Sequence, residues 1–133
     1  MRTEDNKRSA GGALVHEDLS YEIIGCAQRV HAALGPGFPE TVYHKALAHE
    51  LIKAKIPFQS QAEFEVAYDS VVCGRFRADL FVKDRIILEL KAVEALCKEH
   101  EAQALAYLKA TGCRVALLLN FGEKSLTVRR FVN

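Results

Sequence analysis

Two acidic residues and a lysine on neighbouring predicted strands form the most reactive pattern in the sequence. Asp79 lies ten positions before Glu89, and Lys91 follows Glu89 by two. Because side chains alternate along a strand, Glu89 and Lys91 share one face. A three-residue connection at 83–85 would place Asp79 directly opposite Glu89. A two-residue connection would place Asp79 opposite Leu88 instead, unless a bulge restored the register.

Two facing carboxylates beside a lysine could bind a metal ion and hydrolyse a phosphodiester. Close carboxylates repel each other, so a divalent cation is their natural neutraliser, and hard oxygen ligands suit Mg²⁺ or Mn²⁺ better than zinc. Lys91 could orient or help deprotonate an attacking water and stabilise charge on a phosphoryl oxygen. The alternative is that all three are solvated residues on an exposed sheet face. Their apolar flanks favour strands covered on both sides.

The hydrophobic periodicity predicts the elements that must position these residues. Helical spacing covers 19–34, 39–54 and about 93–110, and strand patterns cover 64–68, 71–82, 86–91, 114–120 and 126–132. The order α-α-β-β-β-α-β-β indicates an α/β fold with a mixed central sheet flanked by helices. Residues 1–17 are expected to form a flexible N-terminal tail, and residues 18–133 a single domain.

The composition limits the function classes. The 133 residues carry 18 Lys and Arg against 17 Asp and Glu, a net charge of +1. Bulk charge therefore does not attract nucleic acid, and any such binding must come from a local site. The polar first ten residues and the lack of a long apolar run predict a cytoplasmic protein without a membrane segment. The four cysteines lack metal-site pairing and are expected to be reduced thiols.

Further motifs surround the acidic hairpin. Residues 37–43 read G-x-x-E-x-x-Y, and residues 79–91 read D-x9-E-L-K. The segments 30–31, 34–37, 77–80, 89–92, 107–108 and 120–122, together with Gln103, fit the same pattern. Over residues 20 to 133 the chain thus resembles the GxxExxY group of the PD-(D/E)XK (RecB-like) nuclease superfamily. That resemblance implies a restriction-endonuclease-like core and a Mg²⁺- or Mn²⁺-dependent nuclease acting on DNA or, as second choice, RNA.

The resemblance also implies roles for the acidic residues and the lysine. Asp79 and Glu89 would be metal ligands, Lys91 the catalytic lysine, and Glu40 an additional carboxylate directed at the same metal. From the residues alone, the favoured interpretation of Glu40 is a first-turn acid that complements the helix dipole. Ala78 occupies the position of the superfamily's proline, where no side-chain chemistry is needed.

Four further residues are candidates for substrate binding. Gln103 and Tyr107 match the Q-x-x-x-Y element, which in similar proteins positions DNA or the catalytic lysine, and their spacing puts them on one helix face. Tyr43 completes the G-x-x-E-x-x-Y motif. Both tyrosines could instead be core aromatics with a hydrogen-bonded hydroxyl. Strand parity predicts that Arg77 shares the face of Asp79 and contacts phosphate.

Two other functional arrangements stay open from the sequence. One is a non-catalytic module that retains the nuclease fold and binds nucleic acid or a protein. The other, implied by the resemblance, is a homodimer in which two such sites act on opposite strands.

Overall fold

The computed structural model of the chain describes residues 2–4 and 15–133. In chain order, the elements are β1 (Arg2–Glu4), α1 (Glu17–Leu34), α2 (Glu40–Lys53), β2 (Phe58–Tyr68), β3 (Val71–Val82), β4 (Ile86–Lys91), α3 (Lys98–Thr111), β5 (Val115–Asn120) and β6 (Thr127–Val132). From α1 onward this order confirms the predicted α-α-β-β-β-α-β-β succession. Within the described ranges, no helix is long and apolar enough to cross a membrane.

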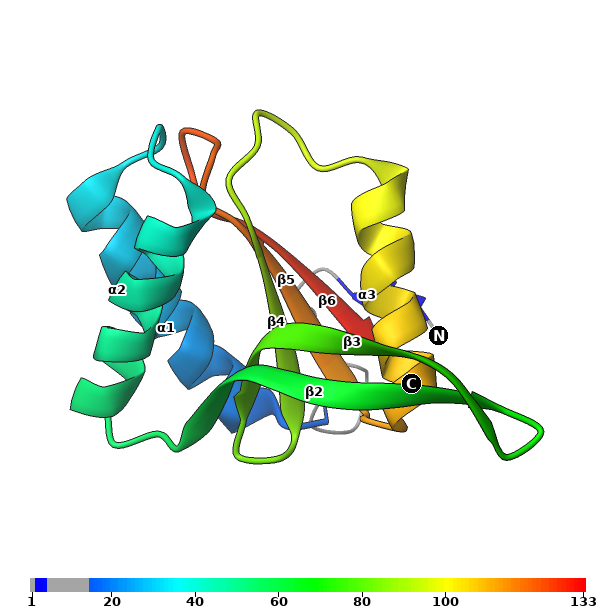
Figure 1. Ribbon diagram of the computed structural model, residues 1–133. Coiled ribbons are helices and arrows are strands. Elements are labelled where there is room, and N and C mark those ends of the chain that lie inside the picture. Colours follow the sequence, from blue (N-terminus) through cyan, green and yellow to red (C-terminus); the bar gives the residue numbers. More distant parts are fainter. Residues whose placement is uncertain (1, 5–14) are drawn as a thin grey trace.

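The six strands form one mixed sheet in the order β1-β6-β5-β4-β3-β2. Neighbouring strands are antiparallel except β4 and β5, which are parallel and are joined by the crossover helix α3. Figure 1 shows α1 and α2 together on one face of the sheet and α3 on the other. The predicted mixed central sheet flanked by helices is therefore confirmed.

Two hydrophobic clusters hold these layers together. All six residues of β5 are buried, as are the first five of β4, which accounts for their continuous apolar sequences. Leu88, Leu117 and Leu119 pack in the cluster under α1 and α2. The alternate residues Ile87 and Leu118 belong to the cluster that also contains Ala104 and Leu108 of α3.

The N-terminal residues differ from the prediction of a flexible tail over 1–17. Residues 2–4 form strand β1, which pairs antiparallel with β6 from Arg2↔Val132 to Glu4↔Arg130. Helix α1 already begins at Glu17. The tail prediction is wrong at these positions because a three-residue edge strand is defined by its partner rather than by its own pattern. Its remaining positions, 1 and 5–14, lie outside the described residues.

The chain after β4 also differs from the prediction, because α3 begins at Lys98 instead of near Val93. The fully buried side chain of Asn120 accepts a hydrogen bond from the Val93 N–H (3.0 Å) and donates one to the Val93 carbonyl (2.9 Å). These two bonds hold Val93, in the bend of the loop between β4 and α3, beside the end of β5. Gly122 packs against the same segment.

Replacing Gly122 tests how closely these segments approach. A Cβ at this position would lie 2.3 Å from the Val93 carbonyl oxygen, so the backbone would have to move. We expect Gly122→Ala to lower the free energy of unfolding by about 1–3 kcal/mol in urea denaturation. The matched control is Gly74→Ala, where a Cβ meets nothing within 4 Å, and it should leave stability unchanged or raise it, because alanine is favoured over glycine inside a strand. Equal effects of the two substitutions would contradict the close approach.

Candidate active site

The β3–β4 hairpin brings Asp79 and Glu89 together. Its strands are in register at Val82↔Ile86 and Leu80↔Leu88, so the connection is the three-residue 83–85 segment. This confirms the alignment of Asp79 with Glu89, since the next pair in the same register joins these two residues. Backbone pairing, however, stops at Leu80↔Leu88.

Beyond that point the two carboxylates replace the backbone ladder. The Asp79 N–H donates to Oε2 of Glu89 (2.9 Å), and the Leu90 N–H donates to Oδ2 of Asp79 (2.8 Å). Each acidic side chain thus accepts a hydrogen bond from the backbone of the opposite strand. The reciprocal bonds fix the carboxylates side by side, although their negative charges repel.

Burial makes this acidic pair unusual. Glu89 is only 5% exposed. Burial, and after it the nearby Asp79 charge, raise the pKa of Glu89 from 4.5 to about 8, although the Asp79 N–H and Lys91 oppose the shift. Desolvation therefore outweighs the hydrogen bond from the Asp79 N–H, and the raised pKa favours the protonated form of Glu89 near neutral pH.

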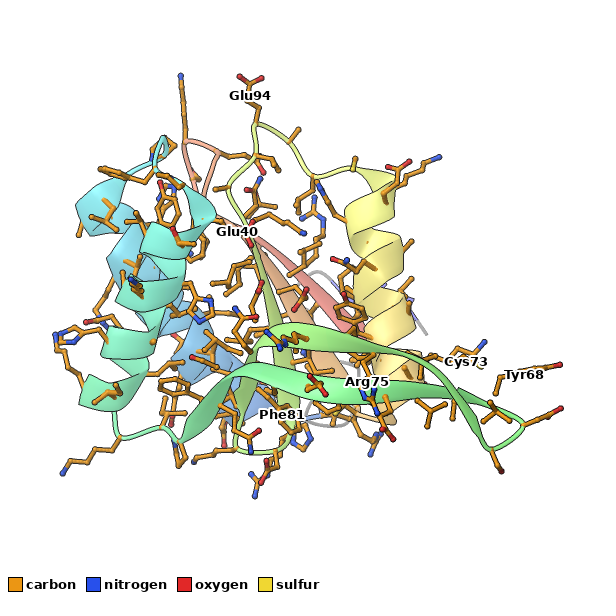
Figure 2. All side chains as sticks on the ribbon, viewed as in Figure 1. Glu40, Tyr68, Cys73, Arg75, Phe81 and Glu94 are labelled. Carbon is orange, nitrogen blue, oxygen red and sulfur yellow. The ribbon has the colours of Figure 1, made fainter. Side chains whose placement is uncertain are left out.

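Glu40 approaches the same pair from the first turn of α2. Figure 2 shows Glu40 at the end of α2 that lies beside β4. Partial burial and the charge of Asp79 raise the pKa of Glu40, whereas Lys91 lowers it. The structure therefore brings Glu40 into the electrostatic environment of Asp79, where the sequence alone allowed a simple helix-dipole role.

Lys91 and the two residues of the Q-x-x-x-Y element border the acidic pair on the α3 side. The Lys91 ammonium donates to Oε1 of Gln103 (3.5 Å). Burial and the charges of Glu89 and Asp79 raise the pKa of Tyr107. The Tyr107 ring stacks on Phe76 with centroids 3.8 Å apart. Gln103 is thus a partner of the lysine, and Tyr107 borders the carboxylates.

Tyr43 does not lie where a substrate-binding residue was expected. It is fully buried and stacks on Phe121 with centroids 4.8 Å apart. Its hydroxyl donates to the Gly35 carbonyl (2.5 Å) and accepts from the Phe38 N–H (3.2 Å). A side chain without solvent exposure cannot contact substrate, so the core-aromatic alternative holds for Tyr43. Its two hydrogen bonds fix the loop between α1 and α2, which leads to Glu40.

Arg77 also departs from its predicted position. It pairs with Glu63 on the neighbouring strand (Nε–Oε2 3.7 Å), and its side chain is 66% exposed. Arg77 does not follow strand parity because the alternation of β3 breaks at Asp79. Ala78 belongs to the cluster under α3, whereas Leu80, two residues later, belongs to the cluster under α1 and α2.

The donor chemistry of the acidic pair fits a hard divalent cation. Oδ2 of Asp79 and Oε2 of Glu89 bind backbone N–H groups, which leaves Oδ1 and Oε1 without a protein hydrogen bond in the described part of the chain. Across those described residues, no three His, Cys, Asp or Glu side chains form a ready-made cage. Mg²⁺ is commonly held by one or two carboxylates together with waters and substrate phosphate, so such a cage is unnecessary.

Comparison with protein families identifies the superfamily of the chain. A family model of the PD-(D/E)XK nuclease superfamily matches residues 17–131. The chain belongs to this superfamily. Its α/β architecture is accordingly that of a restriction-endonuclease-like fold. Searches of curated proteins and of solved structures gave no significant match.

Asn120 and His31 belong to the sequence motifs of this PD-(D/E)XK domain, but the sequence did not predict a role for either residue. The side chain of Asn120 also donates to Glu123 (2.8 Å), and Nε2 of His31 lies 2.8 Å from the Glu123 carbonyl. Both residues are buried and anchor the 120–123 segment beside the end of β4. The burial of these polar side chains indicates their structural role, and burial cannot be read from the sequence.

The hydroxyl of Tyr43 offers a direct stability test. We expect Tyr43→Phe to lower the free energy of unfolding by about 1–2 kcal/mol, because the Gly35 carbonyl and the Phe38 N–H lose their partner while the ring stays packed. Urea denaturation measures the change. Tyr21→Phe, at a residue 80% exposed, is the control and should change stability by less than about 0.5 kcal/mol. A neutral Tyr43→Phe would argue against this anchoring role.

The raised pKa of Glu89 predicts a pH-dependent stability in metal-free buffer. A carboxyl whose pKa rises from 4.5 to about 8 on folding stabilises the protonated folded state. That stabilisation is complete below pH 4.5 and is lost as the pH rises through 8. Relative to Glu89→Gln, which cannot ionise, the wild type should lose stability between pH 5 and pH 9 in urea denaturation with chelator.

The control for this titration is Glu94→Gln. Figure 2 shows Glu94 exposed on the loop after β4 and pointing away from the sheet. Its stability difference from the wild type should be nearly independent of pH. A Glu89→Gln difference that is equally flat would show that the Glu89 carboxyl titrates normally.

Proposed function

We propose that this protein is a Mg²⁺- or Mn²⁺-dependent nuclease that hydrolyses phosphodiester bonds of nucleic acid, with DNA as the preferred substrate. Membership in the PD-(D/E)XK nuclease superfamily supports nuclease activity in general. The observation that carries the specific proposal is the pair of reciprocal hydrogen bonds that fixes Asp79 beside Glu89. This arrangement keeps two carboxylates together in a partly buried place, next to a lysine.

Asp79 and Glu89 would hold the cation, and Glu40 would be an additional carboxylate directed at it. Asp79 and Glu89 each offer one oxygen that the backbone does not occupy, and Glu40 adds a third carboxyl from α2. When bound, the cation would activate a water and neutralise charge on the phosphate. The protein's own contribution is to keep Asp79 and Glu89 side by side despite their repulsion and to shield them from solvent.

Lys91 supplies the positive charge of the site. Its ammonium acts on both Glu40 and Glu89, and Gln103 restrains it through the 3.5 Å contact. A lysine held in this way can orient an attacking water and stabilise the negative charge that develops on a phosphoryl oxygen. Gln103 is then a positioning residue for Lys91, and Tyr107 borders the space where substrate would lie.

Nucleic acid would contact the protein near Asp79 and Glu89 and not across the whole surface. The balanced net charge of +1 gives no general attraction to nucleic acid, so binding depends on the metal and on the immediate surroundings of the site. Arg77 is exposed and adjacent in sequence, but its ion pair with Glu63 reduces its availability for phosphate. The cytoplasmic location and a homodimeric form stay predictions.

Nuclease assays with purified protein test the proposal. DNA and RNA substrates should be cut in the presence of Mn²⁺ or Mg²⁺ and left intact with chelator. Asp79→Asn and Lys91→Ala should each lower the rate at least about a hundredfold, because each removes a group that stabilises the transition state. Lys45→Ala, at an exposed position of α2, is the matched control and should cut at the wild-type rate.

Two results would decide against a nuclease. Cutting that survives both Asp79→Asn and Lys91→Ala would come from a contaminating enzyme. The second result is a wild type that cuts no substrate but binds nucleic acid with an affinity that neither metal nor Asp79→Asn changes. That result would favour the non-catalytic binding module.

A further inference from the structure

Gln61 has an unusual backbone for a residue inside a strand. It has a φ of 53°, in the left-handed region. The other described non-glycine residues with positive φ lie at element ends or in turns, namely His16, Lys55, Asp69, Ser70, Lys83 and Asp84. A left-handed conformation is strained for an L-residue, because it brings the Cβ too close to the following carbonyl oxygen. Such strain persists only where the surrounding structure imposes it, and it often marks functional sites.

The strained residue lies directly across from the first acid. The β2–β3 register pairs Ser60 with Leu80 and Ala62 with Ala78, which aligns Gln61 with Asp79. These two residues are left out of the ladder between two regular pairs. The irregularities of both strands therefore coincide at one point of the hairpin.

At this point β2 changes the face that it presents to the helices. Phe58 packs in the cluster under α1 and α2, and Ser60 contacts His44 of α2 (3.3 Å). Phe64 instead packs with the α3 cluster, although strict alternation would put it on the face of Phe58. The change of face thus occurs between Ser60 and Phe64.

Strand β3 changes face at the opposite position. Leu80 belongs to the cluster under α1 and α2, whereas Ala78 belongs to the α3 cluster and Phe76 stacks on Tyr107. Figure 1 shows the hairpin crossing below the helices, from beneath α1 and α2 toward α3. Both strands therefore pass from one helical layer to the other at Gln61 and Asp79.

We propose that Gln61 is a positioning residue for the metal site, through its left-handed backbone. This backbone lets the two strands change face together, which turns Asp79 out of the β3–β4 ladder and sets its carboxylate against the Leu90 N–H. The inference rests on the proposed metal-dependent function for its consequence, but its structural part can be tested without metal.

The first test compares glycine with alanine at this position. Glycine adopts positive φ freely, whereas in an ordinary strand it is less stable than alanine. We expect Gln61→Gly to unfold at a higher urea concentration than Gln61→Ala. At the control position Gln59, which pairs regularly with Phe81, the order should be reversed. If Gln61→Gly is no more stable than Gln61→Ala, the left-handed backbone is refuted.

The second test measures the consequence for the acidic pair. Amide hydrogen exchange at Asp79 and Leu90 should match the wild type in Gln61→Gly and Gln61→Ala. It should be at least about tenfold faster in Gln61→Val, whose branched side chain excludes positive φ. Gln61→Thr replaces Gln61→Val if the latter fails to fold, and Gln59→Val is the control. Wild-type exchange in the folded branched variant would overturn the proposal.

Calorimetry of Mn²⁺ binding then tests whether the backbone conformation of Gln61 affects the affinity for metal. Gln61→Gly and Gln61→Ala should bind Mn²⁺ as the wild type does, and the branched variant about tenfold more weakly. Equal loss in Gln61→Ala would assign the effect to the amide side chain and overturn the backbone role. A wild type that binds no Mn²⁺ would refute the proposed function, while the exchange and stability tests would still decide the role of Gln61.

Discussion

The carboxylates of Asp79 and Glu89 each accept a hydrogen bond from the backbone of the opposite strand, and the site depends on this exchange. The bonds take the place of the β3–β4 ladder at the point where it ends. They satisfy the backbone and hold two negative charges close together, at the cost of a strongly raised pKa of Glu89. Lys91 and a cation are the groups that can offset this repulsion.

The site lies at the junction of the two helical layers because the β2–β3 hairpin passes from one layer to the other there. This explains why side chains from both layers influence the same acids. Glu40 approaches from α2, and Tyr107 approaches from α3. If the β2–β3 hairpin did not change face, Asp79 would stay in the backbone ladder. Its carboxylate would then lie on one face of the sheet, within reach of only one helical layer.

Several residues of the sequence motifs support the site without lining it. Tyr43 anchors the loop before Glu40, and Asn120 holds the segment after Lys91. Gly122 allows that segment to approach within contact of the chain after β5. A motif therefore combines residues that do chemistry with residues that fix the backbone around them, and only burial and contacts distinguish the two kinds.

The sequence alone determined the order of the elements from α1 onward and the α/β plan of a mixed sheet between helices, and it limited the alignment of Asp79 with Glu89 to a three-residue connection or a bulge. These follow from periodicity and from strand register, which are local properties of the chain. Tertiary structure decided the burial of Tyr43, the displacement of Arg77 toward Glu63 and the pairing of residues 2–4 with β6. Each depends on contacts between distant segments, and regular alternation cannot anticipate a strand that changes face.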